Sequence, residues 1–388
     1  MKIISPTNGL IVALALCANS LACQAAMPAA GSPLTTAAMH VAAPAKAVLI
    51  DLARAGSRLV AVGERGLVLV SDDNGQSWKQ VPVPVSVSLT AVQFADAKHG
   101  WVIGHAGVVL ATVDGGESWK LQLSGLDAAN IELEAARKDL LAVTAAAAAN
   151  TSDATGADEQ ALDSTAVDNA DLRVQNAERL IADGPDKPFL AIHFTDSKHG
   201  LIAGAYGMLL QTNDGGASWQ SLVGHVDNPM GVHLYAIAQH GNDWYLAGEQ
   251  GFVARSSDAG QSFVQLESPY EGSFFTARVT DDGALVVAGL KGHAFISHDS
   301  GQSFELMPVP MPISFSDSTR LADGRTLLAN QAGGLFFSDA KAGAALQMFG
   351  KPLGKPVASL VQAADGSVVV AGFTGLLRLA QPSTAVTE

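Results

Sequence analysis

The stretch "TVDGGESW", Thr112 to Trp119, places two carboxylates and a tryptophan within eight residues. Taken alone, it fits the acid pair of a glycosidase, an acidic loop for a cation, or a turn that holds a fold together. Its recurrence separates these interpretations. Related stretches begin at four other places: "SDDNGQSW" at Ser71, "TNDGGASW" at Thr212, "SSDAGQSF" at Ser256 and "SHDSGQSF" at Ser297.

The five copies follow a repeat of about 41 residues, because their aligned aspartates are separated by 41, 100, 44 and 41 positions. The separation of 100 is one period plus an insertion. Self-similarity at such a period is typical of repeat architectures. The aligned aspartates and the aromatic residues that end each copy are Asp73, Asp114, Asp214, Asp258 and Asp299, and Trp78, Trp119, Trp219, Phe263 and Phe304.

A second pattern precedes each copy: two apolar stretches joined by Gly-x-x-Gly. It begins at Gly63, Gly104, Gly204, Gly248 and Gly289, and related forms begin at Asn330 and Gly372. Each unit then reads as four short strands rich in β-branched and aromatic residues, which is typical of a β-propeller blade. The sequence therefore predicts an all-β, seven-bladed β-propeller, with six blades as the alternative.

The ends of the repeat region are less regular. Near Ser338 lies a degenerate sixth copy, with Ala340 at the aspartate position. The last unit, "VASLVQAADGSVVVAGFTGLLRLA", stops after about three strands. We expect a strand within residues 34–41 to complete it and close the ring.

The octapeptide motif has residue types suited to a turn. Its aspartate can accept hydrogen bonds from turn amides, its glycine permits positive φ, and its aromatic residue packs at the start of the next strand. The motif resembles the Asp box, or bacterial neuraminidase repeat, of sialidases and many non-enzymatic propellers. That resemblance places the box between the third and outermost strands, away from the ligand face. Five equivalent active sites make no chemical sense, so the catalytic interpretation is disfavoured.

The whole repeat resembles the photosystem II assembly factor-like propeller family, in "LTAVQFADAKHGWVIGHAGVVLATVDGGESWK" and "LAIHFTDSKHGLIAGAYGMLLQTNDGGASWQ", over roughly residues 48–379 without the insertion. The resemblance implies a chaperone that binds a membrane subunit. In the non-photosynthetic branch it implies an exported protein, in some cases acting with transporters of the resistance-nodulation-division class. Photosynthetic members carry a basic patch; this chain, with a net charge of -14, shows no comparable cluster.

The first residues resemble an export signal: Lys2 precedes the apolar run "LIVALALCA", Leu10 to Ala18, and small residues follow. We predict a signal peptide over residues 1–26 and a periplasmic or secreted location. Both cysteines, Cys17 and Cys23, lie in this leader. Acylation of Cys23 is the disfavoured alternative, because a lipoprotein needs a large aliphatic residue where Ser20 stands. Later apolar runs are too short to span a bilayer.

Residues 125–187 interrupt the repeat, between blades 1–2 (residues 27–124) and blades 3–7 (residues 188–388). The segments "DAANIELEAARKDLLAVTAAAAA" and "DLRVQNAERLIADG" favour helix, with Asp127 as a candidate N-cap. The insertion holds 13 acidic and 5 basic residues, a net charge of -8. It predicts an acidic helical hairpin, either a solvated decoration or an arm that docks on a partner.

The hairpin connection should lie on the same face as the Gly-x-x-Gly turns and opposite the Asp boxes. Aromatic residues on loops there are candidate binding anchors, or they pack over the mouth of the central channel. The candidate interaction residues are Arg65, His105, Tyr206, Glu249, Lys291, Tyr270, Phe274 and Phe275.

The remaining composition argues against most other functions. Few basic residues and a net charge of -14 disfavour a nucleic-acid surface. The histidines lack metal-ligand spacing, and neither a phosphate loop nor a serine nucleophile elbow is present, so we predict no cofactor and no metal. We therefore predict a non-enzymatic scaffold that binds a membrane protein complex, for example such a transporter, with a glycosidase or sialidase-like propeller as the alternative.

Overall fold

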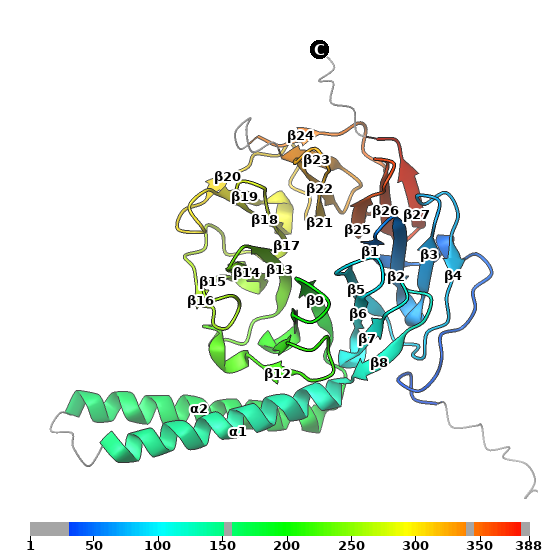
Figure 1. Cartoon of the computed structure of the whole chain (residues 1–388). Helices are drawn as coiled ribbons and strands as arrows, with labels where there is room; N and C mark the ends of the chain where they lie inside the picture. The colour runs from blue at the N-terminus through cyan, green and yellow to red at the C-terminus, as the bar shows by residue number, and fades with distance from the viewer. Residues whose placement is uncertain (1–30, 151–156, 339–344, 382–388) are drawn as a thin grey trace, which may run out of the picture. The chain divides into compact units, whose positions relative to one another are not determined.

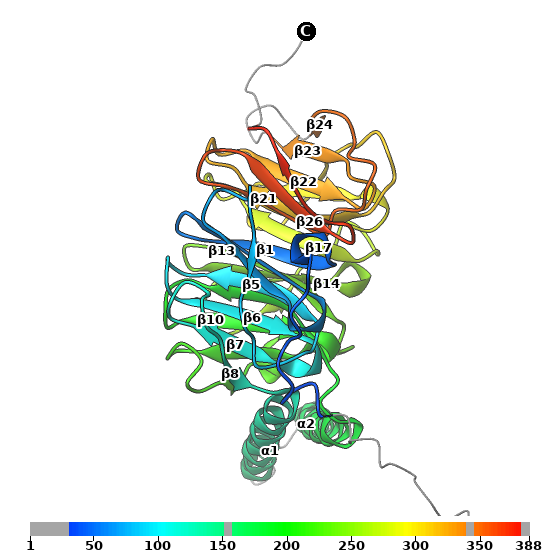
Figure 2. The same cartoon turned by 90° about the vertical axis from the view of Figure 1, so that its right-hand side faces the viewer.

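The computed structural model describes residues 31–150, 157–338 and 345–381, without side chains for 157–163. Residues from Pro33 onward form one unit, and within it the described strands build seven antiparallel sheets. The sheets are arranged in a ring (Figures 1 and 2), and the innermost strand of each packs against that of the next. The predicted leader, Cys17, Cys23 and Ala340 lie outside the described residues.

Six sheets have four strands in chain order from the centre outward, and the seventh has three. The first three sheets are β1 (Leu49–Ala55), β2 (Arg58–Gly63), β3 (Val68–Ser71) and β4 (Lys79–Gln80); β5 (Leu89–Phe94), β6 (Gly100–Gly104), β7 (Val109–Thr112) and β8 (Lys120–Leu123); β9 (Phe189–Phe194), β10 (Gly200–Gly204), β11 (Leu209–Thr212) and β12 (Gln220–Ser221).

The other four are β13 (Leu234–His240), β14 (Asp243–Gly248), β15 (Val253–Ser256) and β16 (Val264–Gln265); β17 (Phe274–Val279), β18 (Leu285–Gly289), β19 (Ala294–Ser297) and β20 (Glu305–Leu306); β21 (Phe315–Arg320), β22 (Thr326–Asn330), β23 (Leu335–Ser338) and β24 (Gln347–Met348); β25 (Ser359–Gln362), β26 (Val368–Gly372) and β27 (Gly375–Leu379).

The ring has two faces made from different turns. We call the face with the Gly-x-x-Gly turns the Gly-turn face. The connections between sheets lie on the same face: the amide of His105, in a Gly-x-x-Gly turn, donates to the carbonyl of Ser88, in the connection between the first two sheets, at 2.9 Å. The opposite face is the Asp-box face. It also carries the turns between first and second strands: the amide of Gly115, in an Asp box, donates to the carbonyl of Lys98, in the turn between β5 and β6, at 3.0 Å.

The second glycine of the Gly-x-x-Gly turn is required at Gly66. Its φ is +75°, and a Cβ there would lie 2.1 Å from the carbonyl oxygen of Val85.

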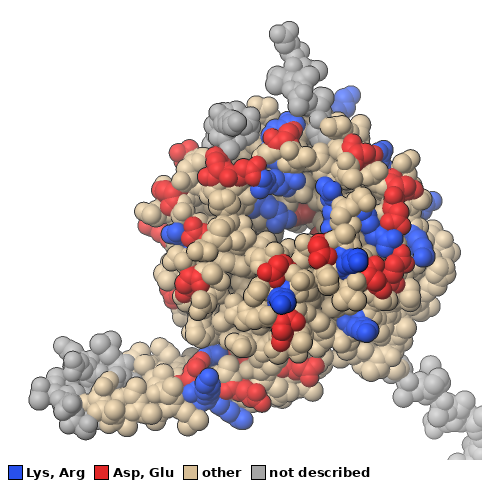
Figure 3. Space-filling view, viewed as in Figure 1, with Lys and Arg blue, Asp and Glu red and all other residues tan. Residues whose placement is uncertain are grey.

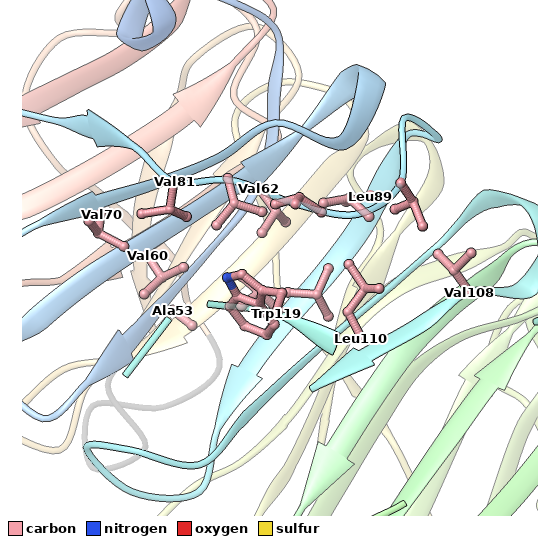
Figure 4. Packing of buried hydrophobic residues seen from close by; sticks show 14 of the residues in the cluster. Ala53, Val60, Val62, Val70, Val81, Leu89, Val108, Leu110 and Trp119 are labelled. Atoms are coloured by element: carbon pink, nitrogen blue, oxygen red, sulfur yellow. The ribbon is translucent and has the colours of Figure 1, made fainter. Parts of the chain in front are cut away.

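The hydrophobic core lies between neighbouring sheets. Between the first two, Val60, Val62 and Val70 pack against Leu110 and Trp119 (Figure 4). The central strands of every sheet are buried on both sides, so their sequences are nearly continuous apolar runs. Removing this apolar surface from water is the main force that holds the sheets together.

The predicted closing strand within residues 34–41 is wrong. That segment contains no strand and follows the outer side of the first sheet instead, where the amide of Ala38 donates to the carbonyl of Val83 at 3.0 Å. The side-chain amide of Gln80 also bonds the backbone of Met39 and Val41. The ring is therefore closed by packing between its first and last sheets, where Leu52 and Leu59 share a cluster with Val361 and Val369.

The insertion forms two helices, α1 (Gly125–Asn150) and α2 (Ala157–Asp183), which pack along each other. The hairpin begins beside the Gly-x-x-Gly turn of the second sheet, where a Cβ on Gly107 would lie 2.4 Å from the Cα of Gly125. It packs on β12 and extends beyond the edge of the ring (Figure 1). Asp127 is not the N-cap: Ser124 precedes the helix, its Oγ accepts from the Asp127 amide at 3.4 Å, and its own amide donates to the Asp127 carboxylate at 3.0 Å, as in a capping box.

A buried ion pair joins both helices to the third sheet. Arg173 of α2 donates to the two carboxylate oxygens of Glu132 on α1 at 2.7 and 3.0 Å, and the side chain of Glu132 is only 3% exposed. Ser221 at the end of β12 donates to the same carboxylate. A Cβ on Gly224 would collide with the Arg173 guanidinium, so this glycine provides the space for it.

Replacing Arg173 with leucine should destabilise the hairpin and its attachment. The Glu132 carboxylate would remain buried without its cation, which typically costs about 3 kcal/mol. We expect a lower free energy of unfolding in urea and faster amide hydrogen exchange in α1 and α2. The matched control is Arg179→Leu, because Arg179 lies on the same helix and is exposed. Equal effects of both changes would contradict the role given to the ion pair.

The Gly-turn face and the central cavity

The Asp-box aspartates organise the turns between third and fourth strands. In each of the five boxes the first Ser or Thr hydroxyl donates to the aspartate at 2.6–2.9 Å, and the later Ser hydroxyl donates to its other oxygen at 2.5–2.6 Å. Backbone amides of the turn donate to the same carboxylates. These bonds stabilise the ionised form, so the pKa of each aspartate falls from 3.8 to about 2.

The boxes also link neighbouring sheets around the ring. The carbonyl oxygen that follows the box aspartate accepts a hydrogen bond from the preceding sheet in three cases. Arg378 donates to Asn74 at 3.0 Å, Arg58 to Gly115 at 3.1 Å, and Trp101 to Gly215 at 3.1 Å. Every donor lies on a strand of the sheet before the box that it contacts.

The box aromatics pack into the core rather than toward solvent. Trp119, Trp219 and Phe263 are buried, and Trp78 and Phe304 are partly buried against the same inter-sheet clusters. The indole of Trp119 donates to the carbonyl of Gly116 at 3.2 Å, which fixes the turn to its own aromatic residue. The box residues thus have turn and packing contacts on one face of the ring.

The predicted interaction residues of the Gly-x-x-Gly turns lie on the Gly-turn face. Arg65, His105, Tyr206 and Lys291 are exposed, and Glu249 is partly exposed. The middle position of these turns has positive φ, including 55° at Arg65 and 59° at Tyr206, so its side chain points out of the turn. The structure therefore makes these five side chains available on one surface.

The three predicted interaction residues Tyr270, Phe274 and Phe275 lie in different environments. Phe274 is fully buried in the core between sheets, so its prediction as an interaction residue is wrong. A β-bulge between Phe274 and Thr276 changes which side of β17 each residue faces, and Phe275 lines the central cavity. Tyr270 is partly buried and stacks on His293, with ring centroids 4.0 Å apart.

A cavity of about 910 Å³ occupies the axis of the ring. Figure 3 shows its opening, with Lys and Arg side chains on the upper rim in that view. Near the Gly-turn face the lining includes Tyr235, Phe275 and Phe373, and His193 and Arg278 lie near the opposite ends of their strands. The wall thus offers both aromatic and polar groups, an arrangement suited to ligands with both characters.

Two carboxylates in the cavity wall tie the innermost strands together. Asp51 of β1 accepts hydrogen bonds from the amide of Val92 at 2.8 Å and from the hydroxyl of Ser359 at 2.7 Å, so it joins three sheets. Asp317 of β21 accepts from the amide of Leu360 at 3.1 Å. Burial, followed by the nearby Asp317 charge, raises the pKa of Asp51 from 3.8 to about 7. Burial also raises the pKa of Asp317.

Two basic groups complete the polar part of the cavity wall. The guanidinium of Arg278 donates to the carbonyl of Ser318 at 2.8 Å and lies 3.6 Å from the Asp317 carboxylate. Burial, with a smaller effect of the Arg278 charge, lowers the pKa of His193 to about 4, so this imidazole is neutral at pH 7. The sequence did not predict this set of four charged or titratable residues in the cavity wall. The signal that could have indicated it is the occurrence of acidic and basic residues at equivalent positions of the innermost strands.

Within the residues that the structure describes, His, Cys, Asp and Glu form no cluster of three that would suit a metal ion. None of the helices in the described ranges has the length and apolar character needed to cross a membrane.

The ring of antiparallel sheets around an axial cavity defines a β-propeller. Solved structures agree: "YCF48 bound to D1 peptide" matches with a TM-score of 0.59 at 15% identity, covering 89% of this chain and 99% of that one. YCF48 from Cyanidioschyzon merolae matches with a TM-score of 0.55 at 14% identity, covering 86% of this chain and 96% of that one. The WD40 propeller domain of Doa1 matches with a TM-score of 0.57 at 10% identity, covering 91% of this chain and 97% of that one.

The chain belongs to the family of the photosynthesis system II assembly factor YCF48, whose model matches residues 70–137 and 175–370. A curated relative, the photosystem II assembly lipoprotein Ycf48 of Synechococcus sp. (strain CC9902), is 32% identical over 77 residues, which are 20% of this chain. That match spans 23% of the relative's length. The predicted family is thus confirmed.

Protonation of Asp51 should make stability depend on pH. Its folded-state pKa of about 7 lies above its ordinary value of 3.8, so the folded protein holds a proton that the unfolded chain has released. The Asp51 contribution to the free energy of unfolding should therefore fall as pH rises from about 4 to 7 and level off above that. The lowered pKa of His193 contributes in the opposite sense over part of this range, so the Asp51 contribution is read as the difference between the wild-type protein and Asp51→Asn in denaturant titrations.

The control for that titration is Asp227→Asn, at an exposed aspartate. Its free energy of unfolding should follow the wild-type dependence on pH. A curve for Asp51→Asn that runs parallel to the wild-type curve between pH 4 and 7, or a wild-type advantage over Asp51→Asn that grows as pH rises, would contradict the account of the cavity wall.

Proposed function

We propose that the chain is an exported, seven-bladed, non-enzymatic propeller that acts as an assembly or accessory factor for a membrane protein complex. The family match over most of the chain carries this proposal, because the family is named for an assembly factor. A structurally similar member is described as bound to a D1 peptide, which supports peptide or protein binding. The proposed partner is a transporter of the resistance-nodulation-division class, as the resemblance to the non-photosynthetic branch of the family implies.

The Gly-turn face is the proposed binding surface. Its turns present exposed side chains at Arg65, Tyr206 and Lys291, whereas the Asp-box turns direct their polar groups into their own hydrogen bonds. The axial cavity reaches this face at Gln331 and Phe373. The acidic hairpin begins there and extends past the ring, so it could contact a partner that covers the face.

A carbohydrate-active propeller is the second candidate, because the cavity wall contains a buried pair of carboxylates. The pKa of Asp51, raised to about 7, is in the range of a general acid. Yet the hydrogen bonds that Asp51 and Asp317 accept come from neighbouring strands, which favours a structural role.

Affinity purification of the exported protein tests the assembly role. We expect a membrane protein complex to co-purify with the full chain and to be lost, or strongly reduced, when residues 126–186 are deleted. Gly125 and Lys187 both lie beside Gly107, so joining the deletion ends should disturb the ring little. Thermal unfolding of the deletion variant checks that it remains folded. Co-purification of the same complex with both proteins would contradict the role of the hairpin.

The carbohydrate alternative makes an opposite prediction. Hydrolysis of a glycan by the purified protein, abolished in Asp51→Asn while the protein stays folded, would overturn the non-enzymatic proposal. We expect no such activity in reducing-sugar assays on a panel of sialosides and bacterial glycans.

A further inference from the structure

Four aromatic rings form a continuous track across the Gly-turn face. Tyr206, 55% exposed, lies 5.1 Å from His233 between ring centroids. His233 lies 6.3 Å from Tyr235, and Tyr235 lies 5.5 Å from Phe275 in the cavity lining. The track therefore runs from the surface of the third sheet, across the fourth, to the mouth of the axial cavity at the fifth.

One carboxylate lies beside the middle of this track. The Glu249 side chain is 35% exposed, and its Oε2 lies 3.8 Å from Nδ1 of His233. It accepts a hydrogen bond from the His233 amide at 3.3 Å, which holds it in place. The pKa of Tyr235 is raised mainly by burial of this tyrosine and secondly by the negative charge of Glu249. The Glu249 carboxylate therefore acts electrostatically on the Tyr235 ring.

Aromatic faces beside a carboxylate are suited to cations. Ring faces carry partial negative charge and attract ammonium and guanidinium groups, and a carboxylate adds a full charge. The chain itself shows this at the outer end of the track, where the Lys187 ammonium lies 5.5 Å from the centre of the Tyr206 ring. The net charge of -14 and the acidic hairpin beside this face favour a cationic partner in the same way.

We propose that this track binds an extended segment of the partner that carries Lys or Arg together with aromatic side chains. Its cation lies between Tyr235 and Glu249, and a neighbouring aromatic side chain enters the cavity mouth beside Phe275. The inference rests on the proposed function and specifies the chemistry of the partner. It states that the Gly-turn face binds a basic segment and not an acidic segment or a glycan.

Short blocked peptides of known composition test the proposal. The probe alternates lysine and phenylalanine, and the comparison peptides replace lysine with glutamate or phenylalanine with glycine. We expect calorimetry on the full chain to detect binding of the lysine–phenylalanine peptide, weakened by salt, and at least tenfold weaker binding of both comparison peptides. Equal or tighter binding of the glutamate peptide would overturn the proposal.

Glu249→Gln removes the charge but keeps an oxygen that can accept from the His233 amide. We expect it to weaken binding of the lysine–phenylalanine peptide about tenfold without changing thermal unfolding. The matched control is Glu64→Gln, because Glu64 occupies the same place in the turn of the first sheet, where Arg65 follows it. A loss of equal size in both variants would show general charge attraction and contradict the assigned site.

Tyr206→Ala provides a second variant. Alanine is tolerated there, because Ala106 occupies the equivalent position with φ 57°. We expect a several-fold loss of peptide binding. The membrane complex should also co-purify less with Glu249→Gln. If it co-purifies unchanged while the hairpin deletion abolishes capture, the basic-segment proposal fails and the assembly proposal stands.

Discussion

Closure of the ring is the constraint on which the other features depend, because each sheet buries its core only against two neighbours. The last sheet has three strands, and the N-terminal segment does not supply a fourth. The seam therefore relies on apolar packing between the first and last sheets and on two hydrogen bonds, from Ser359 to Asp51 and from Arg378 to the carbonyl of Asn74. Asp51 also binds the second sheet through Val92, so one carboxylate connects three sheets at the seam.

The two faces of the ring have different physical roles. On the Asp-box face, aspartates satisfy their own turns, and the next carbonyl accepts a bond from the preceding sheet, as at Gly115 and Gly215. Residues there are constrained by the fold. On the Gly-turn face, the side chain of Tyr206 is exposed and that of Glu249 is partly exposed, beside an axial cavity. This face can therefore change its chemistry without changing the architecture of the ring.

The sequence predicted the parts of the fold that repeat, because each repeat reports the same turn chemistry independently. It predicted the two faces from strand order and the hairpin from helix propensity. It failed where the outcome depends on contacts distant in the chain. The segment before Val41 pairs with residues near Val83 instead of closing the ring. Phe274 is a different case, because it begins β17 beside a local bulge at the position that Leu49 and Leu89 hold in β1 and β5, and all three side chains are buried. The clustering of Asp51, Asp317 and Arg278 likewise requires three sheets to meet.

The partner is proposed to cover the Gly-turn face, and attaching a bulky polymer to each face in turn tests this most directly. Both natural cysteines lie at positions 17 and 23, within the predicted leader, so Glu271→Cys and Ala217→Cys each provide a single labelling site in a protein produced from residue 27 onward. Both positions are exposed, the first beside the Gly-x-x-Gly turn of the fourth sheet and the second in an Asp box. We predict that polymer at Cys-substituted Glu271 blocks co-purification of the membrane complex and that polymer at Ala217 does not. Blockage only from the Asp-box side would contradict the account.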